Sequence, residues 1–307
     1  MNRFIWLVRR EVWEHKAIWM APLIVLGCLL AVSIFGRVHL GPLGQVQEGM
    51  SPFKDISQET LTAVVTLVYA GLTVAMFWVL GIISFFYSLD SLYADRRDRS
   101  VLFWKSLPLS DAETVLSKFA VAAVLIPLVA LVGAVASHFV VAGAMSLKLT
   151  LTGLPVAFLW DPRALAGGIV VSLLWCLMEI LWYAPLIGYL MLASAWAPRA
   201  PFLWAVLPPV AAVVLERVLF YTSYAGDFIS YRIFGPLHVL EGREEGVDED
   251  PKTEAELREA LEKLADRDLV ANLGDYFTSA ELWIGVLVAG LLIAAAMWVR
   301  RYRDETS

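Results

Sequence analysis

Three charged residues occur inside long apolar stretches of the sequence, where burying an ionised side chain is energetically costly. Glu179 lies in the stretch 164–197, and Glu216 and Arg217 lie late in the stretch 202–224. A charged side chain in hydrocarbon costs at least about 2.5–3.5 kcal/mol on insertion scales, so such a residue is a functional candidate. Glu179 either lines a substrate path or a dimer interface, or is a protonated or hydrogen-bonded carboxyl that holds helices together.

The sequence lacks the short motifs of common enzyme and metal sites. It contains no HExxH, GxSxG or CxxC pattern, and its two cysteines both lie in apolar stretches. A P-loop requires Gly-x4-Gly-Lys-Ser/Thr, and neither Lys105-Ser106 nor Lys252-Thr253 follows a glycine-rich turn. His138 is expected to be an interfacial histidine with satisfied hydrogen bonds rather than a ligand. We therefore expect no catalytic residue, no metal site and no cofactor in this chain.

The composition requires an apolar solvent for most of the chain. Of the 307 residues, 59% are hydrophobic and 18% are charged, and the mean hydropathy is +0.67. Soluble domains contain about 45–50% apolar and about 25% charged residues, and one soluble core cannot bury this much apolar surface. The composition excludes a soluble globular enzyme, a disordered chain, collagen and a coiled coil, and it predicts a protein of the lipid bilayer.

Six apolar stretches are long enough to cross a bilayer as helices, which takes about 20 residues each. They are residues 17–36, 61–88, 119–147, 164–197, 202–224 and 282–299. None of them alternates with a period of two, as membrane β-strands would. The fourth stretch is too long for one upright helix, so it should tilt, extend beyond the bilayer or kink at Pro185. The sequence predicts an all-α polytopic membrane protein with six transmembrane helices in a single domain, residues 1–307.

The distribution of Lys and Arg predicts which side of the membrane each segment faces. With the N-terminus inside, the cytoplasmic segments hold thirteen Lys and Arg residues and the two short outer loops hold four. This difference favours cytoplasmic positions for both termini. Because Glu11 and Glu14 precede the first stretch and no small-residue cleavage site follows it, we expect a retained helix rather than a cleaved signal.

Residues 1–16 are predicted to form an amphipathic helix on the inner membrane surface. Its apolar side chains fall on one side of a helix, at Phe4, Leu7, Val8 and Val12. Arg10 and Glu14 have the i,i+4 spacing of an ion pair within one helix. This helix is either a solvated lead-in to the first span or an elbow that also contacts a cytoplasmic partner.

The segment 89–118, between the second and third stretches, combines charges with large apolar side chains. Its basic and aromatic residues include Arg96, Arg97, Arg99, Phe103, Trp104 and Lys105. A segment that only had to be solvated would not contain Phe and Trp. Pro108 ends it, and Ser110 and Glu113 have the spacing of a capping box that begins the next helix. The segment either inserts into a groove on another protein or is a tight connector with its aromatic rings among the lipid headgroups.

Residues 222–280, between the fifth and sixth stretches, account for the acidity of the chain. Their net charge is −8, so the remaining residues carry +2 of the total of −6. Residues 253–268 are predicted to form a helix with a single leucine stripe. That stripe packs either against a second subunit or against the outer mouth of the protein, unless the helix is a solvated acidic lid.

The run DRRDRSVLFWKSLPLSDAETVLSK, residues 95–118, resembles the loop between the second and third spans of bacterial ABC-2-type exporter permeases. In that family a cluster of bases and acids precedes an FWKSLP-like stretch. The general plan is similar as well, with an amphipathic N-terminus, six spans and a polar segment before the last span. The resemblance implies a coupling helix within 89–118 that docks on an ATP-binding subunit through the basic and aromatic residues named above.

The same resemblance implies the partners. Two copies of the ATP-binding subunit would bind ATP and Mg²⁺, and a second permease chain, in a homodimer, would complete the transporter; no nucleic acid is expected. The substrate cavity would lie between the two permease chains, lined by spans two and five, and residues 228–240 would re-enter the membrane or form an interfacial lip. The location would be the bacterial inner membrane, and the aromatic-rich interior favours an amphipathic or hydrophobic substrate.

Two other functions stay open. A secondary transporter could use Glu179 and Glu216 as proton carriers, although the inverted repeat typical of such proteins is not evident in the sequence. A membrane protein of assembly or sensing is the second alternative. An ATP-binding subunit encoded next to the chain would favour the ABC transporter over both.

Overall fold

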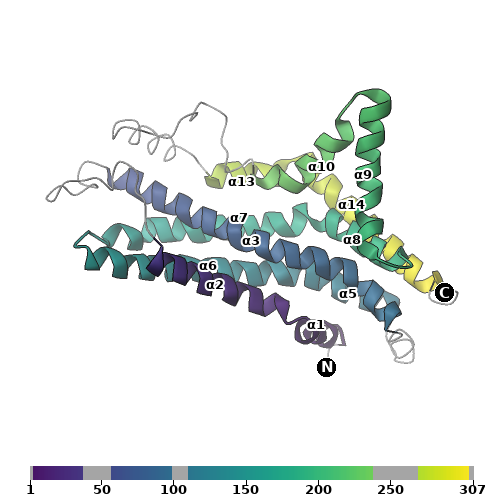
Figure 1. Ribbon diagram of the computed structural model, residues 1–307, viewed down its shortest axis with the longest axis horizontal. Coiled ribbons are helices and arrows are strands. Elements are labelled where there is room, and N and C mark those ends of the chain that lie inside the picture. Colours follow the sequence, from purple (N-terminus) through teal and green to yellow (C-terminus); the bar gives the residue numbers. More distant parts are fainter. Residues whose placement is uncertain (1–2, 37–56, 99–109, 238–268, 304–307) are drawn as a thin grey trace.

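The computed structural model describes residues 3–36, 57–98, 110–237 and 269–303, which form helices joined by short turns (Figure 1). In chain order the elements are α1 (Arg3–Glu14), α2 (Ala17–Phe35), α3 (Gln58–Arg97), α5 (Asp111–Ala120), the π-helical η2 (Val121–Leu125), α6 (Ile126–Leu151), η3 (Ala157–Trp160), α7 (Pro162–Trp182), α8 (Ala184–Trp196), α9 (Pro201–Phe220), α10 (Tyr224–Phe234), η4 (Gly235–Leu237), α13 (Leu269–Thr278) and α14 (Ala280–Arg303). None of these residues lies in a β-strand. Six helical segments are long and apolar enough to cross a membrane, which confirms the prediction of an all-α, six-span protein.

The longest single helix, α3, organises the bundle. It contains 40 residues and is therefore about 60 Å long at 1.5 Å per residue. It packs against α6, α7 and α8, and α2 packs against α3 and α6. Because the hydrocarbon core of a bilayer is only about 30 Å thick, one or both ends of α3 must project from it. The last turn of α3 carries Arg96 and Arg97.

The third span is one continuous helical segment with a π turn inside it. Helix α5 continues through η2 into α6, and Pro127 lies in the first turn of α6. Ser84 of α3 donates a hydrogen bond to the carbonyl oxygen of Ala122 in the π turn (3.0 Å). A π turn shifts the helical hydrogen-bond pattern and leaves backbone groups open to such partners.

The fourth apolar stretch is broken where Pro185 predicts a break. Helix α7 ends at Trp182 and α8 begins at Ala184. Proline is tolerated in the first turn of a helix, where its missing N–H would have no partner, so Pro185 begins a new helix instead of interrupting one. Because of this break, Tyr183 lies at the junction of two helices.

His138 of α6 is buried within the helical bundle, and its expected position near a membrane interface stays a prediction. Its side chain is fully buried. Its Nε2 lies 3.0 Å from the Tyr69 carbonyl oxygen and 3.2 Å from Thr73 Oγ1, and its ring stacks on that of Tyr69. Thr73 in turn hydrogen bonds Ser172 (2.7 Å). Thr73 thus connects His138 Nε2 of α6 with Ser172 of α7 inside an apolar bundle, as most buried polar groups find partners, whereas His138 Nδ1 has no hydrogen-bond partner among the described residues.

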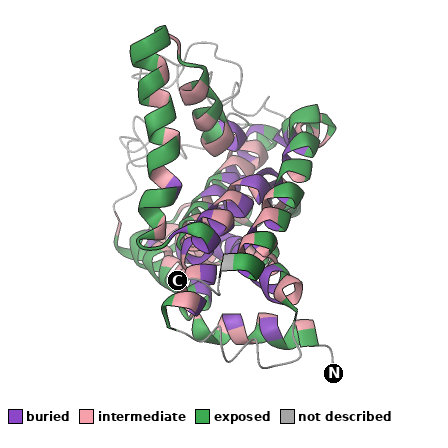
Figure 2. Ribbon diagram, turned by 90° about the vertical axis from the view of Figure 1, so that its right-hand side faces the viewer, coloured by how far each residue is buried: buried purple, intermediate pink, exposed green. Residues whose placement is uncertain are grey.

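Helix α9 leaves the bundle and lies across its long axis (Figure 1). Ala200 and Tyr221, with φ of 47° and 54°, form left-handed turns at its two ends. Ala205 is its only buried residue, and Figure 2 shows most of the helix as exposed. Helix α10 then returns towards the bundle, where Phe234 stacks on Trp78 of α3. Most of the apolar surface of α9 therefore has no protein partner within the part of the chain that the structure describes.

Helix α1 confirms one local prediction at the N-terminus. Arg10 and Glu14 form the expected ion pair, with 2.8 Å between Arg10 Nε and Glu14 Oε1. The buried residues of α1 are Leu7 and Glu11, so an acidic side chain faces the protein along with an apolar one. The position of α1 on a membrane surface stays a prediction, and the predicted helix 253–268 lies outside the described residues.

Candidate functional site

Two of the six residues assigned to a docking element lie within the described chain. These are Arg96 and Arg97, at the end of α3. Arg99, Phe103, Trp104 and Lys105 lie outside the described residues. The structure therefore describes the two roots from which the 99–109 segment departs, the end of α3 and the start of α5, and the docking role of the six residues stays a prediction.

The arginines at the first root have different surroundings. Arg96 donates from Nη2 to the carbonyl oxygens of Ser194 (2.6 Å) and Ala197 (2.9 Å) at the end of α8. The last carbonyls of a helix have no partner within it and attract cations, so Arg96 fixes the end of α8 to the end of α3. Arg97 is exposed and pairs with Asp98 (3.0 Å) and Asp90 (3.4 Å).

The second root is a capped helix start, as the sequence predicts. Ser110 Oγ accepts a hydrogen bond from the Glu113 backbone N–H (3.1 Å), and Glu113 Oε2 accepts one from the Ser110 N–H (2.8 Å). This reciprocal capping box satisfies two N–H groups that would otherwise lack partners. It fixes where α5 begins, directly after the 99–109 segment.

Five charged residues from four helices form a buried ionic network between these roots. The network consists of Glu11 in α1, Asp95 in α3, Asp111 and Lys118 in α5, and Arg300 in α14. Lys118 Nζ lies 3.0 Å from Glu11 Oε1 and 3.5 Å from Asp95 Oδ1. Arg300 contacts Asp95 Oδ2 (2.9 Å) and Asp111 Oδ1 (3.3 Å). Acidic and basic side chains therefore alternate along the network.

The ionic network is excluded from water except at Asp111. The side chains of its other four members are at most 7% exposed, whereas that of Asp111 is 32% exposed. Tyr87 adds a hydroxyl group that donates to Glu11 Oε2 (2.9 Å). Removing an ion from water costs several kcal/mol even after relaxation, and close pairing with further hydrogen bonds is what offsets that cost. The alternating contacts supply this pairing at every buried charge.

The ionic network connects both roots of the 99–109 segment to the first and last helices. Asp95 lies in the last turn of α3 and Asp111 is the first residue of α5, while Glu11 and Arg300 belong to α1 and α14. From the sequence alone, Lys118 and Arg300 are only two of the positive charges expected in the cytoplasm. The available signal is Glu11, which falls four residues after Leu7 on the apolar side of the N-terminal helix.

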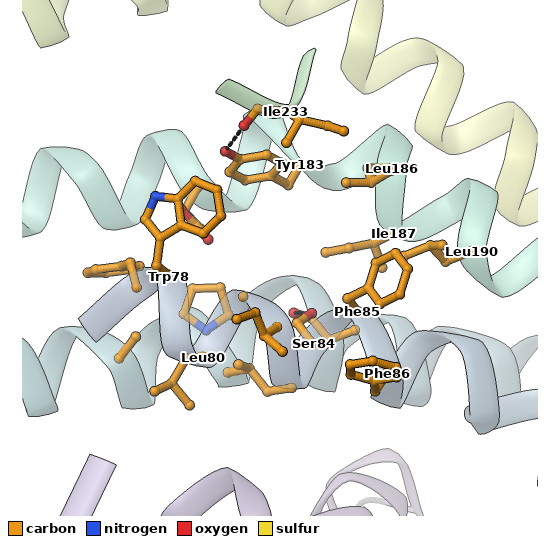
Figure 3. A pocket seen from close by; sticks show the side chains of 18 of the residues that line it. Trp78, Leu80, Ser84, Phe85, Phe86, Tyr183, Leu186, Ile187, Leu190 and Ile233 are labelled. Carbon is orange, nitrogen blue, oxygen red and sulfur yellow. Dashed lines mark hydrogen bonds between the residues drawn. The ribbon is translucent and has the colours of Figure 1, made fainter. Parts of the chain in front are cut away.

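A cavity of about 280 Å³ surrounds the other predicted site residue, Glu179. It lies between α3, η2 with the start of α6, and the α7–α8 junction, and Ile233 of α10 contributes to its edge. Figure 3 shows Trp78 and Phe86 of α3 and, from the α7–α8 side, Tyr183 and Ile187. Helix α9 contributes no residue to this cavity, and the expected substrate cavity between two chains, lined by spans two and five, stays a prediction.

Two hydroxyl groups in the cavity wall are already hydrogen bonded within the protein. The Tyr183 hydroxyl donates to the Ile233 carbonyl oxygen (2.7 Å), and Ser84 donates to the π turn as described above. Trp175 lies one helical turn before Glu179, and its buried indole N–H lacks a hydrogen bond of good geometry. Glu179 is the only carboxylate among the lining residues. The cavity therefore presents one acidic group in an aromatic and aliphatic wall.

Glu216 and Arg217 occupy a different place from Glu179. Glu216 accepts hydrogen bonds from the backbone N–H groups of Tyr224 (2.8 Å) and Ala225 (2.7 Å), so it caps the start of α10. Arg217 is exposed on α9. Neither residue lines the cavity. The structure therefore does not bring the two candidate proton carriers together.

Comparison with known families agrees with this arrangement. Residues 58–183, from the start of α3 to the α7–α8 junction, match the family described as ABC-2 family transporter protein. The matched region contains the 99–109 segment with both of its roots, and Glu179 with much of the cavity wall. No curated protein and no solved structure matches the chain. Residues 58–183 are therefore similar to the ABC-2 transporter family, and the six span-length helices indicate a multi-pass membrane protein.

Proposed function

We propose that this chain is the permease subunit of an ATP-driven exporter in the bacterial inner membrane, with both termini in the cytoplasm. A separate ATP-binding subunit holds ATP and Mg²⁺, and the 99–109 segment docks on it. The cargo is an amphipathic or hydrophobic compound. The observation that carries this proposal is the buried ionic network, which connects both roots of the docking segment to α1 and α14.

The ionic network explains how movement of the docking segment would reach the membrane helices. Asp95 and Asp111 stand on either side of the segment, and Arg300 contacts both carboxylates. A push on the segment therefore moves the ends of α3 and α5 together instead of bending the connection between them. Arg96 extends this rigid unit to the end of α8. Rigid-body movement of packed helices is a common route between two transporter states.

Two copies of the chain are required for a complete transporter of this kind. The exposed surface of α9 supports this part of the proposal, because only Ala205 of that helix is buried within one chain. In a homodimer, α9 would contact the second copy on part of its surface and lipid on the remainder. Two ATP-binding subunits would then dock on the two symmetry-related 99–109 segments.

The test is co-purification of the ATP-binding subunit from native membranes. Trp104→Ala and Arg99→Ala should reduce the amount of ATP-binding subunit recovered, while the permease itself still elutes as a folded species in size-exclusion chromatography. Arg163→Ala is the matched control, because Arg163 is exposed at the start of α7, far along the chain from the segment. Full recovery of the ATP-binding subunit with both loop variants would contradict the proposed docking site.

A further inference from the structure

The cavity around Glu179 has the chemistry of a binding site for one class of ligand. We propose that it binds hydrophobic organic cations, in which an ammonium group carries aromatic or aliphatic substituents. This inference rests on the proposed export function, because it names the class of compound that the permease accepts. It is argued from the lining of the cavity and needs no property of the ATP-binding subunit.

The size and shape of the cavity suit a small ligand that arrives from the side of the bundle. Its volume of about 280 Å³ is close to the lower end of the range for small-molecule sites, about 300–1,000 Å³. Its inner wall contains fully buried side chains such as Phe77 and Leu80. Ile82 and Phe86 also line it, and both are more than half exposed. A ligand can therefore enter past these two residues from the surface of α3.

The charge in the cavity is of one sign. Glu179 is its only carboxylate, and no Lys, Arg or His occurs among the lining residues. Glu179 is partly buried, and a partly buried carboxylate without a basic partner loses hydration that a neutral wall replaces only in part. A ligand cation beside Glu179 would supply that missing partner, whereas an anion would add repulsion in a poorly hydrated site.

The aromatic rings of the cavity favour the same class of ligand. Trp78, Trp175 and Tyr183 all line it together with Glu179. The faces of Trp and Tyr attract organic cations within about 6 Å of the ring centre, and quaternary ammonium groups are recognised in this way. The aliphatic side chains Leu186 and Leu190, further along α8, supply surface for an apolar substituent. The wall thus combines an acid, aromatic faces and an apolar floor.

The ligand preference can be measured with the whole chain in lipid nanodiscs, without ATP or the ATP-binding subunit. Equilibrium binding of radiolabelled phenylbutyl-trimethylammonium is compared with that of its neutral analogue, in which carbon replaces the ammonium nitrogen. Nanodiscs of phosphatidylcholine alone keep the membrane contribution equal for all variants. The wild-type chain should bind the cation at least tenfold more tightly than the neutral analogue, which corresponds to about 1.4 kcal/mol.

Glu179→Gln should abolish the preference for the cation, and Glu216→Gln, at the cap of α10 and outside the cavity, should keep it. A second variant guards against misfolding of Glu179→Gln. A Cβ atom at Gly81 would lie 3.6 Å from Glu179 Oε1 in ordinary contact, so Gly81→Leu should cover the carboxylate and also abolish the preference. Equal affinity of the wild-type chain for the two probes, or an unchanged preference in both Glu179→Gln and Gly81→Leu, would overturn the proposal.

Failure of this inference can be told apart from failure of the proposed function. Glu179→Gln and Gly81→Leu should co-purify with the ATP-binding subunit as well as the wild-type chain does, because neither residue contacts the ionic network. If the two variants lose the preference for the cation and still co-purify with the ATP-binding subunit, both the ligand class and the proposed docking function are supported. Intact co-purification without any cation preference in the wild-type chain removes only the ligand class.

Discussion

The amino group of Lys118 lies 3.0 Å from a carboxylate oxygen of Glu11, and both side chains are almost completely buried. The two residues belong to α5 and α1, which are 107 positions apart in the chain at this contact. Neither charge can be removed alone without leaving the other buried and short of a partner. The N-terminal helix is therefore an integral part of the bundle at the end where the 99–109 segment departs.

Lys118→Met should destabilise the protein strongly. Removing one partner of a buried ion pair costs about 3–5 kcal/mol, because the remaining charge is left without compensation, and here Glu11 and Asp95 both lose a contact. Thermal unfolding of the purified chain in detergent, followed by size-exclusion chromatography, measures the change. The double variant Glu11→Gln with Lys118→Met should recover part of the loss, since it removes the uncompensated carboxylate.

The matched control for the ionic network is Arg97→Gln at the neighbouring surface. Arg97 pairs with Asp90 and Asp98, but these side chains are about half exposed. Exposed pairs contribute only about 0–1 kcal/mol, so the melting temperature should hardly change. A loss for Arg97→Gln as large as that for Lys118→Met would show that burial is not what gives the network its importance.

Gly168→Ala should weaken the packing of α7 against α3. A Cβ atom at Gly168 would lie 2.8 Å from Tyr69 Cβ and 2.9 Å from Tyr69 Cδ2. The Tyr69 ring cannot move aside, because its hydroxyl is bonded to the Leu159 carbonyl oxygen and its face is stacked on His138. Overpacking of this kind costs about 1–3 kcal/mol, and the melting temperature of the purified chain should fall accordingly.

Gly71→Ala serves as the comparison for Gly168→Ala. Gly71 lies in α3, two positions after Tyr69, and a Cβ atom there would meet nothing within 4 Å. Alanine is the better helix former by about 1 kcal/mol, so this variant should be neutral or slightly more stable. If the two alanine variants melted alike, close approach at Gly168 would not be the reason for its glycine.

Glu216→Gln should leave ATP hydrolysis by the complete transporter unchanged. Glu216 caps α10 and does not line the cavity with Glu179, so it has no place in a shared proton path. Vesicles that contain the permease alone should also keep an imposed pH gradient, measured with an enclosed fluorescent pH indicator. A gradient that collapses with the wild-type chain and persists with Glu216→Gln would instead support the proton-coupled alternative.

Asp161 should make stability depend on pH at the start of α7. Its carboxylate accepts hydrogen bonds from the Thr62 hydroxyl and from the Arg163 backbone N–H, and these bonds lower the pKa of Asp161 below its usual value. Because the pKa is lower in the folded state, the ionised carboxylate stabilises the fold at pH values above the ordinary pKa of about 3.9. This stabilisation is lost as the pH falls through the pKa of the folded state.

Asp161→Asn should therefore melt at a lower temperature than the wild-type chain at neutral pH, and the difference should shrink as the pH falls below the ordinary pKa of about 3.9. Thermal unfolding over this pH range measures the difference. Thr62→Val removes the first donor to Asp161 and should reduce the same pH dependence. A difference between wild type and Asp161→Asn that stayed constant with pH would exclude the charged form as the source of the stabilisation.

Local features of the structure were accessible from the sequence. The break at Pro185, the capping box of Ser110 with Glu113 and the ion pair of Arg10 with Glu14 each involve residues within four positions of one another. Their geometry is fixed by the helix itself, so spacing alone predicts them. The six spans followed for a similar reason, because a run of about 20 apolar residues needs no knowledge of its neighbours to be recognised.

The contacts between helices were not accessible in this way. Spacing within the chain does not reveal that Glu11 meets Lys118, that Asp95 meets Arg300, or that His138 faces Tyr69. Each pair joins different helices, and many arrangements of six apolar helices are compatible with one hydropathy pattern. Helix α9 illustrates the point, because its sequence predicts a span and only the turns at Ala200 and Tyr221 direct it out of the bundle.

The sequence by itself determined that this protein lies in lipid, where its helices occur and which charged residues are most costly to bury. Composition and helical period decide these properties, since transfer into lipid depends on each segment separately. Only the tertiary structure decided which charges receive partners. It pairs Lys118 and Arg300 with carboxylates of other helices, and it surrounds Glu179 with aromatic side chains and no base. The physical reason is that the energy of a buried charge depends on the atoms within a few ångströms of it, and packing brings those atoms from distant parts of the chain.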